Sequence, residues 1–205
     1  MTAFLLVTAA IVVAVGVPAI LLLRRRAARR RAIEEIEMSD ELTGVGNRRR
    51  LDRDLAVESA SADTPVAVIK IDVDQFHRIN DEHGRPAGDA VLCQLADVLR
   101  AEVRTGDVVY RYADEEFCVL LARTTTGEAG LVAERMRFAV SQMQLAVEDS
   151  VTVSIGVALG RGEHVKQTMQ RADEALAKSK YDGCDRVTLA VQPLLGPLAV
   201  THHLD

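Results

Sequence analysis

An uncharged run of 21 residues, from residue 3 to residue 23, constrains the architecture of this chain more than any other feature. Only Thr8, Gly16 and Pro18 interrupt its apolar side chains. A helix of that length is about 32 Å long at about 1.5 Å per residue, which is close to the hydrocarbon thickness of a bilayer. The run therefore predicts a single transmembrane helix over residues 1–23.

Six arginines follow the run at residues 24–31, and no acidic residue precedes them. Lys and Arg next to a membrane span remain on the cytoplasmic side. We therefore expect a single-pass protein of the inner (cytoplasmic) membrane, with its N-terminus outside and the rest of the chain in the cytoplasm. A cleaved signal peptide is the alternative, but its charges would come before a shorter apolar core, the reverse of the order found here.

The remainder of the chain is acidic and has the composition of a globular domain. It carries 19 basic side chains against 30 acidic ones, although the net charge of all 205 residues is only -5. A protein that binds duplex nucleic acid needs a basic face to neutralise phosphates, so this balance argues against that function. With 48% apolar and 27% charged residues, the composition also excludes a disordered chain.

Strand and helix patterns follow one another irregularly after the arginines. We expect a short basic linker helix over residues 24–39, one domain over 40–191 and a flexible tail over 192–205. The hydrophobic periodicity predicts strands at 66–72, 108–112, 117–121, 151–159 and 186–191, and helices at 75–82, 87–100, 128–141 and 164–180. A tight hairpin in the middle distinguishes this order from plain βα repeats. The predicted fold class is α+β, with a five-stranded sheet covered by helices.

Two aspartates, Asp72 and Asp74, stand where the first predicted strand ends and a helix begins. Carboxylates beside free backbone N–H groups at such a junction can hold a metal ion and a phosphate. Aspartate is also favoured as a helix N-cap. The pattern leaves both interpretations open, a cap or a ligand.

Residues 111–117, R-Y-A-D-E-E-F, form the turn between the two middle strands and carry Asp114, Glu115 and Glu116. A charged hairpin tip is in most proteins only solvated. If the fold brings this tip next to Asp72, however, the carboxylates form the kind of cluster that binds Mg²⁺ for phosphoryl transfer.

Four segments together resemble the GGDEF family of diguanylate cyclases. Residues 39–50, S-D-E-L-T-G-V-G-N-R-R-R, resemble its opening motif, and residues 71–89, I-D-V-D-Q-F-H-R-I-N-D-E-H-G-R-P-A-G-D, are similar to its D-x-D-x-F-K-x-I-N-D segment. V-S-I-G-V-A at 153–158 and A-D-E-A-L-A-K-S-K-Y-D-G at 172–183 resemble its later signatures. The resemblance implies a palm-like sheet related to that of nucleotidyl cyclases and polymerases.

Members of this family condense two GTP molecules into cyclic di-GMP, with two domains meeting face to face. The resemblance thus implies GTP as substrate, Mg²⁺ (or Mn²⁺) as cofactor and a homodimer. The metal would assist attack of one 3′-hydroxyl on the other α-phosphate. The residues that the resemblance assigns are Asp72, Glu115 and the Val73 carbonyl for the metal, Asn80 and Asp89 for guanine, Lys180 for the triphosphate, and Glu115 with Glu116 for catalysis.

The chain departs from the family pattern at the signature itself, where Ala113 and Asp114 stand in place of two glycines. Glycine accepts a positive φ and lets a nucleotide approach the backbone, whereas Asp114 adds bulk and negative charge. Like charges about 4 Å apart repel by about 1 kcal/mol in water and more in a dry site. On the phosphate side His77 replaces a lysine, Arg85 a histidine and Cys184 an arginine. These departures predict weak or absent cyclase activity.

Residues 104–107, R-T-G-D, reproduce the R-x-x-D motif that binds cyclic di-GMP as an inhibitory site in this family. Arg135 falls where a supporting arginine is sometimes found. A guanidinium can bind phosphate or the guanine edge through two hydrogen bonds, and Asp107 can accept from guanine N–H groups. A simple surface ion pair between Arg104 and Asp107 is the alternative.

The sequence favours a membrane-anchored GGDEF-like domain with weak or no cyclase activity that acts as a nucleotide-responsive regulatory module. An active diguanylate cyclase is the first alternative, because the residues assigned to metal, guanine and triphosphate remain. A protein-interaction scaffold that has lost both nucleotide sites is the second.

Overall fold

A computed structural model describes residues 22–26, 29, 34–60, 64–144, 150–161 and 164–190. The chain forms two compact units, Met1–Ser39 and Asp40–Asp205. In the first unit, residues 22–26 and 34–37 are helical. Among the described residues no helix is long and apolar enough to cross a membrane. The predicted membrane segment lies outside the described residues except for its last two positions, and the predicted tail lies wholly outside them.

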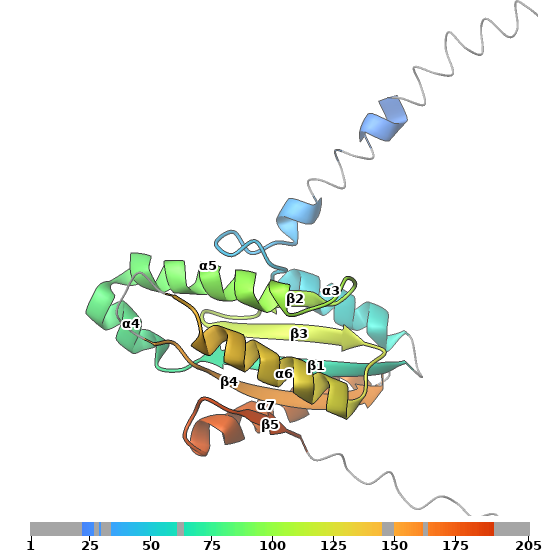
Figure 1. The fold of residues 1–205 in the computed structure, drawn as a ribbon. Coiled ribbons are helices and arrows are strands. Elements are labelled where there is room, and N and C mark those ends of the chain that lie inside the picture. The colour runs from blue at the N-terminus through green and yellow to red at the C-terminus, as the bar shows by residue number, and fades with distance from the viewer. Residues whose placement is uncertain are drawn as a thin grey trace, which may run out of the picture. The chain divides into compact units, whose positions relative to one another are not determined.

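The second unit is built on one five-stranded sheet with the strand order β2-β3-β1-β4-β5 (Figure 1). Its strands are β1 (Pro65–Val73), β2 (Val108–Arg111), β3 (Glu116–Ala122), β4 (Val153–Arg161) and β5 (Val187–Leu189). Its helices are α3 (Arg48–Ser59), α4 (Phe76–His83), α5 (Arg85–Ala101), α6 (Thr126–Ser141) and α7 (Val165–Tyr181). All neighbouring strands are antiparallel except β4 and β5, which are parallel. The predicted α+β fold with a five-stranded sheet is confirmed.

Helix α3 is the element of this unit that the sequence patterns do not predict; the others agree with the prediction to within two residues at each end. Asn47 caps α3 by accepting a hydrogen bond from the backbone N–H of Arg50. Leu51 is fully buried, and Leu55, one turn later, packs against the same cluster. The apolar face of α3 is therefore only two large residues wide, too little for a clear helical period in a segment rich in charges.

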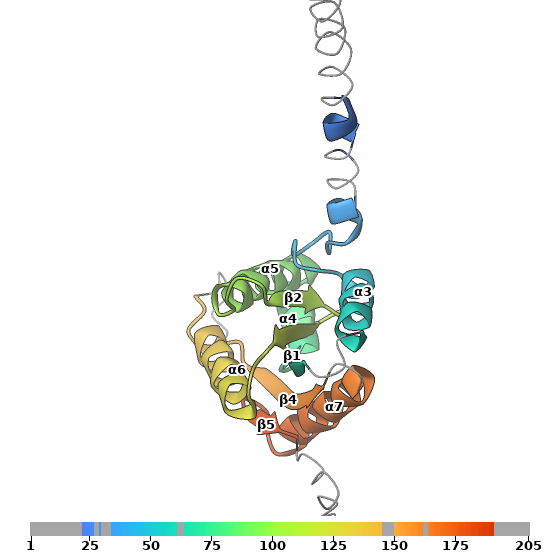
Figure 2. The same cartoon turned by 90° about the vertical axis from the view of Figure 1, so that its right-hand side faces the viewer.

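The sheet has helices on both faces, with α5 and α6 on one side and α3 and α7 on the other (Figure 2). Strand β1 lies at the centre and is buried on both sides, as expected for a strand covered twice. Ile69 and Ile71 pack in the cluster that includes residues of α5 and α6. Val68 lies in the second cluster, which includes Leu51 of α3 and Ala172 of α7.

Helix α7 approaches the sheet closely because β4 carries a glycine where the two meet. A Cβ atom on Gly156 would lie 2.2 Å from the carbonyl oxygen of Ala172 and 2.2 Å from the backbone nitrogen of Leu176. Both are backbone atoms, which cannot rotate away. Gly156 therefore sets the height of α7 above β1 and β4.

Replacement of Gly156 by alanine should push α7 away from the sheet. We expect Gly156→Ala to lower the free energy of unfolding by about 3 kcal/mol, measured by urea denaturation. Gly127→Ala is the matched control, because Gly127 lies in α6 with open space around its Cα, and it should raise stability by about 0.5–1 kcal/mol. Equal effects of the two substitutions would contradict this account of the packing.

Candidate functional site

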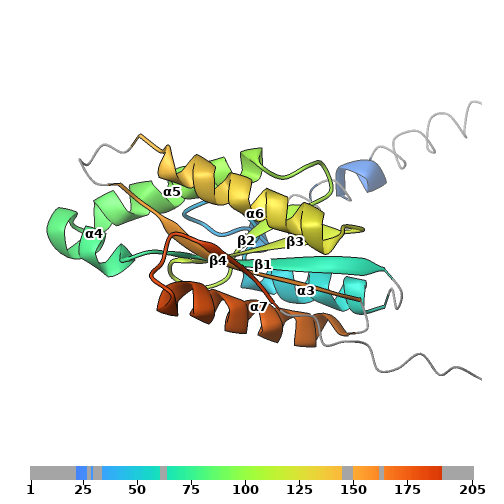
Figure 3. The same cartoon turned by 60° about the horizontal axis from the view of Figure 1, so that its bottom comes forward.

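Asp72 and Asp74 lie at the end of β1, where the chain turns into α4 at one end of the sheet (Figure 3). The residue at the N-cap of α4 is Gln75, in the left-handed conformation with φ 54°, and no side chain caps the helix. The capping interpretation is therefore wrong for both aspartates. Their carboxylates instead face β4 and α7, through the contacts described next.

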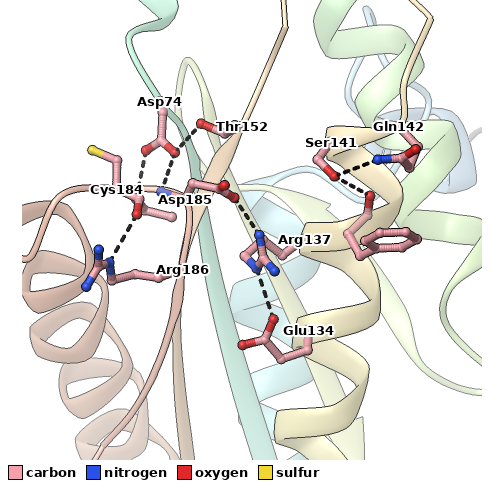
Figure 4. A network of polar contacts seen from close by, with 11 residues as sticks. Asp74, Glu134, Arg137, Ser141, Gln142, Thr152, Cys184, Asp185 and Arg186 are labelled. Atoms are coloured by element: carbon pink, nitrogen blue, oxygen red, sulfur yellow. Dashed lines mark hydrogen bonds and ion pairs between the residues drawn. The ribbon is translucent and has the colours of Figure 1, made fainter.

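Asp74 is an acceptor for several donors and has little surface left for a ligand, since its side chain is only 5% exposed. It accepts hydrogen bonds from Ser154 Oγ at 2.7 Å, Thr152 Oγ1 at 2.8 Å and the backbone N–H of Asp185 at 3.0 Å (Figure 4). Burial alone would raise the pKa of Asp74, but these hydrogen bonds and the charge of Lys180 outweigh it and lower the pKa. Asp74 thus ties β1 to β4 and to the loop after α7.

Lys180, near the end of α7, places its ammonium between the two aspartates. Its Nζ lies 2.5 Å from Asp72 Oδ1 and 3.1 Å from Asp74 Oδ1. Burial would lower the pKa of Lys180, but the two carboxylates outweigh this effect and raise it. The ammonium is therefore a fixed positive charge at the end of β1.

The hairpin between β2 and β3 places Glu115 within electrostatic reach of Asp72, the condition under which the sequence predicts a metal site. Burial, and next the negative charge of Asp72, raise the pKa of Glu115 above its usual range. Asp114 and Glu116 add to this repulsion. Neither Ala113 nor Asp114 has a positive φ. Among the described residues, the non-glycine residues that do are Gln75, Arg123, Cys184 and Asp185. The two missing glycines therefore cost no backbone strain here, and the expected penalty reduces to bulk and charge.

Arg111 holds this hairpin from the side and was not singled out from the sequence. Its Nε and Nη2 donate to the carbonyl oxygen of Asp114 at 3.0 and 2.7 Å, and its Nη1 lies 3.1 Å from Asp40 Oδ1. Burial raises the pKa of Asp40, but hydrogen bonds from Thr43 and Arg111 outweigh it and lower the pKa. The turn at the start of the second unit thus reaches the signature hairpin, a contact that a separation of 71 residues hides in the sequence.

Asn80 of α4 and Asp89 of α5, the residues assigned to guanine, come from neighbouring helices. Gly88 allows this approach, since a Cβ there would lie 2.0 Å from Asn80 Oδ1. The Asn80 amide therefore rests against α5 one residue before Asp89, and Asp89 is exposed. The structure thus places the Asn80 amide next to the helix that carries Asp89, and the assignment of the two residues to guanine stays a prediction.

The three departures on the phosphate side supply no buried cation. His77 and Arg85 are exposed, on α4 and at the first residue of α5. Cys184 lies in the loop after α7 with φ 63°, and its Sγ turns back to the carbonyl of Lys180 at 3.8 Å. The next residue, Asp185, pairs with Arg137 of α6 at 2.7 Å (Figure 4).

Arg104, Asp107 and Arg135 line one hollow of about 250 Å³, together with residues of α6. Arg104 Nε lies 3.1 Å from Asp107 Oδ2, so the ion pair expected as the alternative does form. Burial raises the pKa of Asp107, although Arg104 opposes this effect. Arg135 pairs with Glu102, a lining residue that the sequence did not indicate, at 2.9 Å. The structure brings the three predicted residues together, with two guanidinium groups at the wall of a cavity.

The oxygen donors at the end of β1 fit a hard divalent cation. Lys180 Nζ also lies 3.4 Å from the Val73 carbonyl oxygen, so a positive charge stands between two of the predicted metal ligands, Asp72 and Val73. In the ranges that the structure describes, no group of three or more His, Cys, Asp or Glu side chains is arranged to hold a metal ion. A cation here would therefore depend on Asp72, Glu115, the carbonyl and oxygens of a bound ligand.

Comparisons with known proteins agree with the motifs. The family model described as diguanylate cyclase, GGDEF domain, matches residues 37–186. The diguanylate cyclase DgcM of Escherichia coli (strain K12) is 36% identical over 162 residues, which are 77% of this chain and 40% of DgcM. The chain thus spans about two fifths of the length of this relative.

Two solved structures share the fold. The diguanylate cyclase SiaD of Pseudomonas aeruginosa, in complex with its activator SiaC, has a TM-score of 0.80 and 32% identity, and covers 92% of this chain and 75% of its own. The coiled coil and GGDEF domain of DgcB from Caulobacter crescentus, in complex with c-di-GMP, has a TM-score of 0.76 and 27% identity, over 86% of this chain and 98% of its own. With a family model that matches residues 37–186 and a shared fold, this chain belongs to the GGDEF-domain family of diguanylate cyclases.

Proposed function

We propose that this chain acts in cyclic di-GMP signalling as a GGDEF domain that binds cyclic di-GMP in the hollow at Arg104, and that its cyclase activity is weak or absent. The observation that carries this proposal is a contrast between two regions. In the hollow, the side chains of Arg104 and Arg135 are 61% and 58% exposed, at a wall that also carries the carboxylates of Glu102, Asp107 and Glu128. At the end of β1, Lys180 is already paired with two carboxylates, and Asp114 adds a further negative charge.

The hollow has the donors and acceptors that cyclic di-GMP needs. Arg104 and Arg135 can each bind a phosphate or the O6/N7 edge of guanine with two hydrogen bonds, and Asp107 can accept from the guanine N–H groups. Arg104 is held at the mouth by its hydrogen bond to the Ala122 carbonyl, so it loses little freedom on binding. The structure of DgcB in complex with c-di-GMP supports this ligand.

Charge is the reason to expect weak catalysis. A triphosphate next to Glu115 would also meet Asp114, whose charge already reaches Glu115. Cys184 cannot offer the fixed positive charge or the two hydrogen bonds of an arginine. Lys180 must also leave Asp72 or share it before a metal can bind there. Each of these effects weakens the binding of GTP with its metal.

An active diguanylate cyclase is the second candidate, favoured by the unstrained hairpin and by the names of the relatives. In that case Asp72, Glu115 and the Val73 carbonyl would hold Mg²⁺ or Mn²⁺, which would neutralise the phosphates and activate the attacking hydroxyl. Asn80 and Asp89 would orient the guanine, and Lys180 would move from Asp72 to the triphosphate. Glu116 would stay in its contact with the sheet, described below.

We also propose that residues 1–23 anchor the domain in the cytoplasmic membrane, and that GTP-bound domains meet as a homodimer if catalysis occurs. External protease added to spheroplasts should leave the domain intact, because the arginines that follow the span hold it on the cytoplasmic side. Lysed spheroplasts treated in the same way are the control. Digestion from outside would contradict this orientation.

Substitution of Arg104 should remove most of the affinity for cyclic di-GMP. We expect Arg104→Ala to weaken binding about 30-fold in calorimetric titration, because charge-assisted hydrogen bonds to the ligand are lost. Arg53→Ala is the matched control, since Arg53 forms an exposed ion pair on α3, and it should bind as the unchanged protein does. Absence of binding by the unchanged protein at millimolar ligand would favour the scaffold alternative.

Removal of the charge at Asp114 should improve the binding of GTP with Mg²⁺. We expect Asp114→Asn to tighten it about fivefold, since one repulsion of about 1 kcal/mol disappears. Asp97→Asn changes the net charge equally at an exposed site on α5 and should have no effect. Three results together would instead identify an active cyclase. The unchanged protein would turn over GTP rapidly, Glu115→Ala would abolish that turnover, and Asp114→Asn would have no effect on it.

A further inference from the structure

The central strand of the sheet contains a lysine whose side chain is fully buried. Lys70 lies between Ile69 and Ile71 and is 0% exposed. It points to the face covered by α7, where Cys118 of β3 and Gly156 of β4 are its neighbours across the sheet. Taking an ammonium out of water costs several kcal/mol, so an apolar residue at this place would be the less costly choice.

The partners of Lys70 come from three elements. Its Nζ lies 3.1 Å from Asp173 Oδ1 on α7 and 3.7 Å from Glu116 Oε2 at the start of β3. It also lies 3.5 Å from the centre of the Tyr112 ring, just before the tip of the signature hairpin. None of these contacts is a hydrogen bond: the Asp173 contact is short enough but lacks the geometry, and the Glu116 contact is too long. The ammonium is therefore held by charge and by the ring rather than by directed bonds.

Two of these partners belong to opposite arms of the hairpin. Tyr112 comes before the tip and Glu116 after it, and the backbone N–H of Tyr112 donates to the Glu116 carbonyl at 2.7 Å. The N–H of Ala113 donates to the same oxygen at 3.3 Å. Lys70 thus contacts both arms from beneath, at the point where the hairpin closes. Arg48 of α3 adds a second cation, 4.6 Å from the Tyr112 ring.

The contact with Lys70 also separates the two glutamates of the signature. Glu116 pairs with Asp72 in the register of the sheet, but its carboxylate reaches Lys70, two residues back along β1. Glu115, at the tip, remains within electrostatic reach of Asp72.

We propose that Lys70 is a positioning residue for the signature hairpin: its buried ammonium draws Glu116 and Tyr112 against the sheet and so keeps Glu115 near Asp72. A role in placing a metal ligand rests on the second candidate function, in which Asp72 and Glu115 share a metal. In this chain, where the tip lacks both glycines, a charge beneath the hairpin sets its position. Lys70 acts through Glu116 and touches neither metal nor nucleotide.

The test is hydrogen–deuterium exchange of the full chain in detergent, followed at the hairpin amides of Tyr112 and Ala113. Lys70→Met keeps the volume and removes the charge, and should speed their exchange about tenfold without changing residues 153–158 of β4. The double variant Lys70→Met/Glu116→Gln should return towards the original rate, because the hairpin then carries no uncompensated charge at residue 116. Asp173 also loses its partner, but its side chain is 51% exposed and water can solvate it. Glu174→Gln, at an exposed position of α7, is the matched control and should change nothing.

Equal exchange in the unchanged protein and Lys70→Met, or no recovery in the double variant, would overturn the proposal. If Lys70→Met fails to fold, Glu116→Gln alone decides, since it should also speed hairpin exchange and an unchanged rate would refute the role of the pair. Titration with Mn²⁺ alone separates this inference from the metal site of the second candidate function. Absence of Mn²⁺ binding with the expected exchange pattern would refute the metal site and leave the role of Lys70 standing.

Discussion

The close approach of α7 to the sheet determines where the charges of the candidate site lie. Because Gly156 has no side chain, the backbone of α7 rests directly on β4 and beside β1. Two α7 residues about two turns apart, Asp173 and Lys180, then reach two β1 residues, Lys70 and Asp72, each with the opposite charge. An outward displacement of the helix would lengthen both pairs. The packing at one glycine is thus the condition for the electrostatics of the site.

The end of β1 is an acidic site that the ammonium of Lys180 neutralises only in part. Asp74 accepts three hydrogen bonds and shares Lys180 with Asp72, so it serves as a structural tie between β1, β4 and the loop after α7. Glu115 lies within electrostatic reach of Asp72, and its pKa is raised by burial and by that charge. A bound cation would reduce the repulsion between the two carboxylates. The negative charge of Asp114 repels a polyanionic ligand at the same place. The end of β1 therefore has the arrangement of residues expected of a nucleotide site, while its negative charges oppose the binding of a triphosphate.

The hollow at Arg104 differs from the end of β1 in its geometry and in its charge. Its two arginines are held by the Ala122 carbonyl, by Asp107 and by Glu102, so the guanidinium groups stand ready on a cavity wall. Both arginine side chains are largely exposed, whereas the Asp107 side chain is only 5% exposed. A ligand that draws Arg104 away from Asp107 would therefore have to supply a donor to that carboxylate. This difference supports the proposal that the domain binds cyclic di-GMP and has weak or absent cyclase activity.

The sequence by itself determined the family, the order of the elements and the residue types of both sites, because strand periodicity and local motifs are written in neighbouring positions. It did not reveal α3, whose apolar face rests on Leu51 and Leu55 alone. Tertiary structure decided three further points: Asp74 is a buried acceptor, the hairpin closes without a positive φ at Ala113 and Asp114, and Lys70 pairs with Glu116. Each depends on contacts between segments far apart in the chain, and a buried charge is recognisable only when its partners are seen.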